Sequence, residues 1–253
     1  MKPPLMSLLD DQGIATVTID GAKAMNIIGS PEILALTDTL ARLRDEPALR
    51  VLVLRGRDDR AFIGGADIAE MAALAPPTAE AFITRLKDLC EAVRHFPVPV
   101  IARLAGWCLG GGLEVAMACD LRLASTDSQY GMPEVKVGIP SVIHAALLPR
   151  LVGPSAASWL LLTGDTIDAA AALGHGLLHQ VHAPDALDAA VQRLAGQLAS
   201  LGPKVLGQQK RLLRDWERLS LDDAIAASVA EFGLAFTTGE PQHHMRRFLE
   251  RKR

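Results

Sequence analysis

The sequence predicts an α/β core followed by a helical C-terminal region. Up to about Ser141, strand-like apolar runs alternate with helix-like ones, and glycines occupy the turns that lead from strand to helix. Beyond that point strand patterns nearly vanish, and Ala- and Leu-rich helical patterns continue to the end. This alternation is typical of α/β chains, which bind ligands at strand ends. We expect the core to span residues 1–195 and the helical region to span residues 196–253.

The first predicted elements are a hairpin and a helix. Ser7–Leu9 and Ile14–Ile19 flank the turn Asp10–Gly13, and the second run alternates as a strand does. A helix is expected to begin at Ser30, because the proline that follows suits the first helical position. Apolar residues at helical spacing continue this helix to Leu43.

The next elements are a strand and two helices. Val51–Leu54 is an apolar run of strand length, and the loop Arg57–Gly65 follows it. Ala66–Ile68 opens a helix, and a second helix is expected across Thr78–His95. This second helix leads through two prolines into the predicted strand Val98–Arg103.

The same order then recurs around a run of three glycines. Gly110–Gly112 forms a turn, Leu113–Cys119 a short helix, and Leu121–Ala124 another strand. The helical patterns of the C-terminal region are separated at glycines and prolines, which end helices. These breaks are Gly153-Pro154, Pro184, Gly202-Pro203 and Gly239-Glu240-Pro241.

The composition describes a globular protein with no evident nucleic-acid partner. Of the 253 residues 49% are apolar and 22% are charged, and 26 basic against 29 acidic residues give a formal charge of −3. Such a charge does not favour binding to nucleic acid or to anionic membranes. The basic segment Arg246–Arg253 is a local exception. We expect no nucleic-acid partner and no membrane partner.

Several features predict a cytoplasmic protein. Cys90, Cys108 and Cys119 each lie in an apolar context, as reduced core cysteines do. The opening residues Met1–Pro4 lack the apolar core of a signal peptide. We also expect no uninterrupted apolar run of membrane-spanning length.

Common cofactor and metal motifs are absent. Gly110–Gly112 lacks the spacing of a dinucleotide-binding motif, and neither a P-loop nor a G-x-S-x-G sequence occurs. His175 and His179 have helical spacing, but the adjacent glycines disfavour a helix and the glutamate of H-E-x-x-H is missing. The adjacent pair His243-His244 would face different sides of a helix. We therefore expect no metal site.

Two glycine-containing turns instead suggest an oxyanion hole. Gly64–Asp67 and Gly110–Gly112 each place free backbone N–H groups at or just before a helix, where negative charge is favoured. Glu114 follows the second turn, and Glu134 lies twenty residues farther on. Oxyanion donors beside carboxylates are the groups that acid–base chemistry at a polarised carbonyl requires. For either turn taken alone, close packing is the simpler explanation.

The chain resembles the crotonase (enoyl-CoA hydratase/isomerase) superfamily over essentially its whole length. The resemblance rests on six segments in the same order and spacing. These segments are Ala61–Ile68, Pro97–Ala102, Gly106–Glu114, Ala118–Ala124, Tyr130–Glu134 and Gly138–Pro140.

The resemblance implies a ClpP-like spiral of ββα repeats with a helical C-terminal region that assembles trimers, often paired into hexamers. It implies an acyl-coenzyme A thioester as substrate, with coenzyme A as part of that substrate and no separate cofactor. By position, the backbone N–H groups of Ala66 and Gly111 would bind the thioester oxygen, and Glu114 and Glu134 would be the catalytic carboxylates. The other substrate-binding or coenzyme A-binding positions are Lys23, Ala24, Gly65, Asp67, Ile68, Gly110 and Ser141.

Two glutamates favour hydration of a 2-enoyl thioester. Water addition requires a base for the water and an acid for Cα, while negative charge collects on the thioester oxygen. We expect Glu114 to activate the water and Glu134 to protonate Cα. An isomerase that moves a double bond with one carboxylate is the first alternative. The second is a non-catalytic binding or assembly protein of the same fold.

Three segments depart from the family pattern or lie at its edge. Ser141–His144 replaces a glycine-rich turn; Ser141 retains an N–H that can bind water, and His144 is a second candidate base. His243–Met245 replaces a common acidic-Gly-Met sequence. Arg251 and Lys252 are candidates for binding the nucleotide of a neighbouring subunit's ligand.

Overall fold

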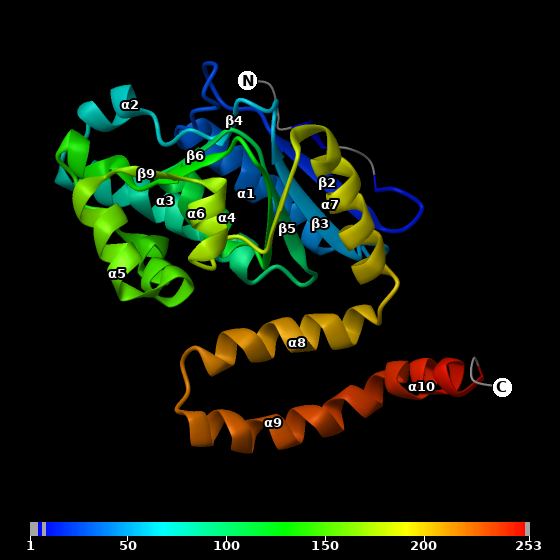
Figure 1. Cartoon of the computed structure of the whole chain (residues 1–253). Helices are drawn as coiled ribbons and strands as arrows, with labels where there is room; N and C mark the ends of the chain where they lie inside the picture. Colours follow the sequence, from blue (N-terminus) through cyan, green and yellow to red (C-terminus); the bar gives the residue numbers. More distant parts are fainter. Residues whose placement is uncertain (1–4, 7–8, 251–253) are drawn as a thin grey trace.

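The computed structural model describes residues 5–6 and 9–250 (Figure 1). Two sheets and their covering helices form the body, and three C-terminal helices extend away from it. The expected strand residues Ser7 and Leu8 and the expected nucleotide ligands Arg251 and Lys252 lie outside the described residues.

The larger sheet has six strands and forms the centre of the body. Its strands β2, β3, β5, β7 and β10 are parallel, and β1 pairs with β2 in the antiparallel sense. In spatial order the strands are β1 (Leu5–Met6), β2 (Ile14–Ile19), β3 (Val51–Gly56), β5 (Val100–Leu104), β7 (Leu121–Ser125) and β10 (Gln180–His182). Nearly every residue of β3 and β5 is buried, as parallel sheets covered on both faces require.

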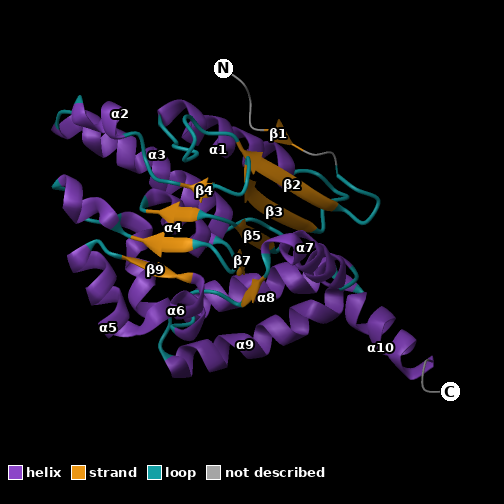
Figure 2. Ribbon diagram, turned by 45° about the horizontal axis from the view of Figure 1, so that its top comes forward, coloured by secondary structure: helices purple, strands orange, loops and turns teal. Residues whose placement is uncertain are grey.

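The smaller sheet has four strands of three residues each. In spatial order they are β4 (Ala61–Ile63), β6 (Trp107–Leu109), β8 (Gln129–Gly131) and β9 (Thr166–Asp168). The pairs β4–β6 and β6–β8 are parallel, whereas β9 is antiparallel to β8. Figure 2 shows this short sheet beside the larger one.

The two sheets are built by a repeated unit. In β3–β4, β5–β6 and β7–β8, the first strand joins the larger sheet and the second joins the smaller one, and helical turns follow. The expected spiral of ββα repeats is therefore confirmed, as is the helical C-terminal region.

The ends of most helices expected from the sequence agree with the structure to within two or three residues. Those of the body are α1 (Ser30–Arg44), α2 (Ile68–Ala72), α3 (Pro76–Arg94), α4 (Gly111–Ala118), α5 (Leu148–Thr163), α6 (Ala169–Gly174) and α7 (Pro184–Ala199). The C-terminal ones are α8 (Pro203–Trp216), α9 (Leu221–Ala235) and α10 (Glu240–Glu250), and the short 3₁₀ turns are η1 (Pro133–Val137), η2 (Ile143–Leu147) and η3 (Phe236–Thr238). The expected boundary at 195/196 lies inside α7, whose apolar side packs on the larger sheet.

Several expectations about strands need correction. Leu5–Met6 is a strand that was not expected, and of the predicted strand Ser7–Leu9 only Leu9 lies within the described residues, outside any strand. The loop predicted at Arg57–Gly65 contains β4. Two more strands, β9 and β10, form in the region predicted to be helical. Each of these strands has only two or three residues, too few for an alternating pattern to reveal.

One helical segment is long and apolar enough on average to span a membrane, although Arg150 and other polar residues interrupt its apolar run. By length and composition alone, Ile143–Thr163 is apolar enough to do so. In the structure η2 and α5 make up this segment, and Gly153 interrupts it with a φ of 78°. Leu148 and Leu160 are buried in the main core, so its inner side packs on the body as a core helix does.

The C-terminal helices are joined to the body by buried charges. Lys210 Nζ on α8 lies 2.7 Å from Asp120 Oδ2, and Arg214 lies 3.0 Å from the other oxygen of the same carboxylate. A further ion pair joins Arg94 of α3 to Glu217. Beyond these anchors, α9 runs back antiparallel to α8, and α10 projects past it (Figure 1).

Candidate active site

Three neighbouring strands of the smaller sheet end at one place. Because β4, β6 and β8 are parallel, their carboxyl ends lie along the same edge. β4 leads to Ala66, β6 leads to the glycine turn before Glu114, and β8 leads to Glu134. The sheet therefore brings together four residues that are far apart in sequence.

The backbone N–H of Ala66 has no backbone acceptor among the described hydrogen bonds. Ile28 N–H donates to Gly65 O at 3.1 Å, and Ile28 O accepts from Asp67 N–H at 3.0 Å. This parallel bridge uses the groups on either side of Ala66 and fixes its orientation. Ala66 also lines the largest apolar cavity described, so its N–H is available to a ligand there.

In the run at 110–112, Gly110 and Gly112 have a steric reason, and Gly111 supplies a backbone donor. Gly110 has a φ of 52°, and a Cβ there would lie 2.5 Å from Glu134 Oε1. A Cβ on Gly112 would lie 2.3 Å from Ile63 O of β4. Gly111 is the first residue of α4, where N–H groups have no intrahelical acceptor. The turn thus presents the second N–H at the N-terminal end of a helix.

Glu114 is a buried carboxylate on the first turn of α4. It is only 3% exposed, and its Oε1 accepts Ala145 N–H at 2.8 Å. Burial raises the pKa of Glu114 to about 8; the N–H groups of Ala145 and His144 oppose this shift, and the charge of Glu134 adds to it. Glu114 is therefore protonated at neutral pH in the free protein.

Glu134, on η1, lines the same cavity as Glu114. Ser141 Oγ donates to Glu134 Oε2 at 2.8 Å. Burial raises the pKa of Glu134 as well, while hydrogen bonds from its own backbone N–H and from Ser141 lower it. Because the charge of Glu134 also raises the pKa of Glu114, the two acids titrate as a coupled pair.

The cavity that contains both acids is large and mostly apolar. Its volume is about 1030 Å³. Residues of α2 and α3 line it, as do residues of the segment between η1 and η2. The apolar lining includes Met71, Phe82, Ile83, Leu86, Ile139 and Val142. We did not predict the α3 residues as site residues from the sequence, because their helical spacing is that of ordinary core positions.

Most of the sequence-predicted site residues line this cavity. They are Lys23, Ala24, Gly65, Ala66, Ile68, Gly110, Gly111, Glu114, Glu134 and Ser141. Asp67 is adjacent to the cavity: its carboxylate caps α2 by accepting Ala69 N–H at 2.9 Å and lies 3.9 Å from Lys23 Nζ.

His144 does not face the carboxylate pair. Its side chain is 7% exposed, and its Nε2 lies 3.2 Å from Glu91 Oε1 on α3. Only its backbone N–H acts on Glu114. The structure therefore does not support His144 as the base that removes a proton from substrate or water.

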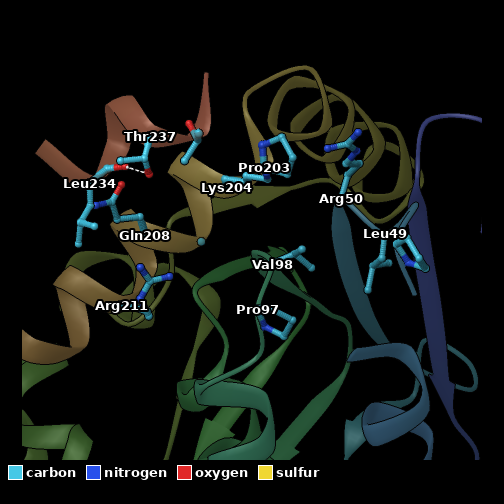
Figure 3. A pocket seen from close by; sticks show the side chains of 13 residues that line it. Leu49, Arg50, Pro97, Val98, Pro203, Lys204, Gln208, Arg211, Leu234 and Thr237 are labelled. Carbon is cyan, nitrogen blue, oxygen red and sulfur yellow. Dashed lines mark hydrogen bonds between the residues drawn. The ribbon is translucent and has the colours of Figure 1, made fainter. Parts of the chain in front are cut away.

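A second cavity separates the body from the C-terminal helices (Figure 3). Its volume is about 680 Å³, and its walls include the cations Arg50, Lys204 and Arg211. No carboxylate lines it, so it lacks the groups for proton transfer. Across the described part of the chain, no group of three His, Cys, Asp or Glu side chains is arranged to hold a metal ion.

Comparisons with known proteins identify close likenesses over the full length. The profile of the enoyl-CoA hydratase/isomerase family matches residues 10–253. A crotonyl-CoA hydratase of Syntrophomonas wolfei is 34% identical over 96% of this chain and 94% of its own. An (E)-benzylidenesuccinyl-CoA hydratase of Thauera aromatica is 34% identical, over 94% of this chain and 93% of its own.

Solved structures give the same result. An enoyl-CoA hydratase of Bacillus anthracis superimposes with a TM-score of 0.94 at 25% identity, covering 99% of this chain and 97% of its own. A second, from Mycobacterium smegmatis, has a TM-score of 0.94 at 26% identity with the same coverage.

Proposed function

The chain belongs to the enoyl-CoA hydratase/isomerase family, and we propose that it adds water across the 2,3 double bond of a 2-enoyl-CoA thioester. The product is a 3-hydroxyacyl-CoA. The sequence-based expectations of this family and of an enoyl-CoA hydratase are confirmed by full-length relatives that carry those names. The residue roles below are proposals.

The backbone N–H groups of Ala66 and Gly111 bind the thioester oxygen. Water attack at Cβ moves electrons through Cα to this oxygen, which gains negative charge as an enolate. Both donors line the cavity, and one lies at the start of α4. Each well-placed donor of this kind is worth ~3 kcal/mol of barrier. Fixed backbone groups supply this stabilisation without rearranging.

The glutamate pair handles the protons. Hydration takes one proton from water and delivers one to Cα, so the pair holds the same number of protons before and after the reaction, while the proton changes from one carboxylate to the other. We assign the water to Glu114 and Cα to Glu134. Since burial keeps the proton on Glu114 in the free protein, this assignment requires the proton to pass to Glu134 when substrate and water bind.

One observation carries the proposal: both carboxylates open into the same apolar cavity as Ala66 and Gly111. An isomerase needs only one acid to move a proton between two carbons. The scaffold alternative needs neither acid, and it leaves unexplained why Gly110 makes room for Glu134.

Incubation with crotonyl-CoA separates these functions. We expect loss of the conjugated enoyl absorbance, and we expect Glu114→Gln and Glu134→Gln each to lower kcat by ~10²–10⁴-fold. Turnover of a 3-enoyl-CoA without hydration of crotonyl-CoA would instead identify an isomerase. Failure to bind coenzyme A thioesters at all would support the scaffold alternative.

The lining of the cavity points to a hydrocarbon acyl group. Much of the lining is apolar, including Met71, Phe82 and Ile83, and apolar side chains favour a hydrocarbon chain. Lys23 also lines the cavity, and its side chain is 66% exposed. We propose that it meets the phosphates of coenzyme A. A panel of C4 to C16 enoyl-CoA substrates would measure the preferred chain length.

We also propose a trimer or a pair of trimers, located in the cytoplasm. Large apolar side chains on α9 and α10 are exposed in the single chain, including Ile225, Val229, Phe232 and Leu249. Exposed patches of this kind mark interaction surfaces. Sedimentation analysis tests the assembly, and a monomer at micromolar concentration would contradict it.

A further inference from the structure

The turn that holds Glu114 contains a strained residue. Ile143 has a φ of 43°, in the left-handed region where a β-branched side chain is costly. The two residues that follow direct their N–H groups at Glu114, and Ala145 N donates at 2.8 Å. A strained turn persists only where surrounding contacts hold it. The contact that holds this turn therefore bears on the catalytic acid.

The side chain of His144 provides such a contact. It is buried, and its Nε2 lies 3.2 Å from Glu91 Oε1. Glu91 belongs to the long helix α3, and its other oxygen lies 2.9 Å from His95 Nε2, one turn farther along. The imidazole thus links the strained turn to a rigid helix of the body.

The surroundings of His144 favour a neutral ring that donates through Nε2. Burial lowers the pKa of His144, against the opposing effect of Glu91. The charged or titratable groups that act on it are Glu91 and Arg94 on α3 and His95, the residue that follows the last residue of α3. Its Nδ1 is buried without a partner among the described atoms. A proton on Nδ1 would be a buried donor with no acceptor, so the ring proton belongs on Nε2, facing Glu91.

We propose that His144 is a positioning residue for the water-adding pair. Its Nε2–H bond to Glu91 holds the Ile143 turn so that the N–H groups of His144 and Ala145 face Glu114. This inference rests on the proposed hydratase function. His144 itself touches neither substrate nor water, because its side chain is absent from the cavity wall.

Loss of the link has a distinct kinetic signature. When the turn relaxes, Glu114 loses its donors and moves; a displacement near 1 Å costs ~10²-fold in rate. The acyl wall and the oxyanion donors stay in place, so KM changes little. N–H donors favour the ionised carboxylate. Losing them raises the pKa of the pair, and the alkaline limb of the pH profile moves upward.

The experiment measures hydration of crotonyl-CoA as a function of pH in five variants. His144→Ala and Glu91→Leu remove the link. His144→Gln and Glu91→Gln each introduce an amide that can still form a hydrogen bond to the remaining partner. His95→Ala is the matched control, because it removes the other partner of Glu91 and leaves the turn untouched. Urea unfolding of each variant separates kinetic effects from loss of fold.

We expect His144→Ala and Glu91→Leu to lower kcat by ~10²-fold with KM within about threefold. Their alkaline limbs should move to higher pH. The two glutamine variants should recover most of kcat, and His95→Ala should match the wild type. If His144→Ala does not fold, the comparison of Glu91→Leu with Glu91→Gln decides.

Two results would overturn the inference. One is an unchanged kcat and pH profile in both disrupting variants, in an enzyme that hydrates crotonyl-CoA; the proposed function would stand. The other is a lower kcat in His95→Ala equal to that in Glu91→Leu, which would assign the effect to α3 itself. A wild type that does not hydrate any enoyl-CoA would refute both the proposed function and this inference.

Discussion

The Glu114→Gln variant exchanges a buried acid for a neutral side chain of the same shape. The amide oxygen can still accept Ala145 N–H, which donates to Glu114 at 2.8 Å in the wild type. The exchange removes the carboxylate that takes the proton of the water, so we expect activity to fall by ~10²–10⁴-fold. It also removes the cost of burying a charge, so we expect the variant to be more stable than the wild type.

The size of this gain depends on pH. Glu114 has an ordinary pKa of 4.5 and a folded-state pKa of about 8. Between these values the unfolded chain has released the proton and the folded protein retains it, so the stability of the wild type falls as pH rises. At ~1.4 kcal/mol for each pH unit, the loss is at most ~5 kcal/mol. Below pH 4.5 both states hold the proton and the contribution vanishes.

Urea unfolding at pH 5, 7 and 8.5, at one fixed protein concentration, measures this effect. We expect the stability gap between Glu114→Gln and the wild type to widen steadily from pH 5 to pH 8.5 by ~2–5 kcal/mol. Glu46→Gln, at an exposed carboxylate, is the control and should show no widening gap. A gap that does not change with pH would refute the reasoning that burial shifts the proton affinity of Glu114.

Three further predictions follow from the same site and its supports. The kcat/KM profile for crotonyl-CoA should be bell-shaped. Its alkaline limb should lie near pH 8, where the pair loses its proton, and its acid limb above pH 4.5, because burial also raises the pKa of Glu134. A flat profile to pH 10 would contradict this. Gly110→Ala should lower kcat by ~10²-fold, measured at saturating substrate, because a Cβ 2.5 Å from Glu134 Oε1 displaces that carboxylate. Lys210→Met should cost ~3–5 kcal/mol in urea unfolding, because it breaks a buried pair with Asp120; a cost below ~1 kcal/mol would show that Arg214 alone satisfies this carboxylate.

The long elements were predictable because local signals suffice for them. The proline after Ser30 and the apolar spacing that follows define α1, and the apolar run at Val51–Leu54 identifies β3. The three-residue strands were not predictable. β4, β6 and β8 form because each pairs with a strand of a neighbouring repeat. A pattern within three residues cannot indicate a pairing partner so far away in sequence.

The sequence could indicate residues that share one cavity, but not the contacts that support them. Glycine turns, two glutamates and the resemblance to the crotonase superfamily together indicated Ala66, Gly111, Glu114 and Glu134, all of which line one cavity. Nothing local on α3 indicated that Glu91 would hold the turn beside Glu114, since an acid on a helix is usually solvated. The contact depends on how α3 and η2 pack, which only the assembled fold defines.

The division of the site into backbone donors and carboxylate side chains has a consequence for how this chemistry can change. The two oxyanion donors, Ala66 after β4 and Gly111 after β6, are backbone groups, whereas the carboxylates are side chains from the β6 and β8 repeats. Polarisation of the thioester is thus independent of the two acids. A chain stripped of both side chains would still activate its ligand toward enolate formation. The fold therefore keeps the backbone groups that activate the thioester apart from the side chains that transfer protons. New reactions can arise when only those side chains are replaced.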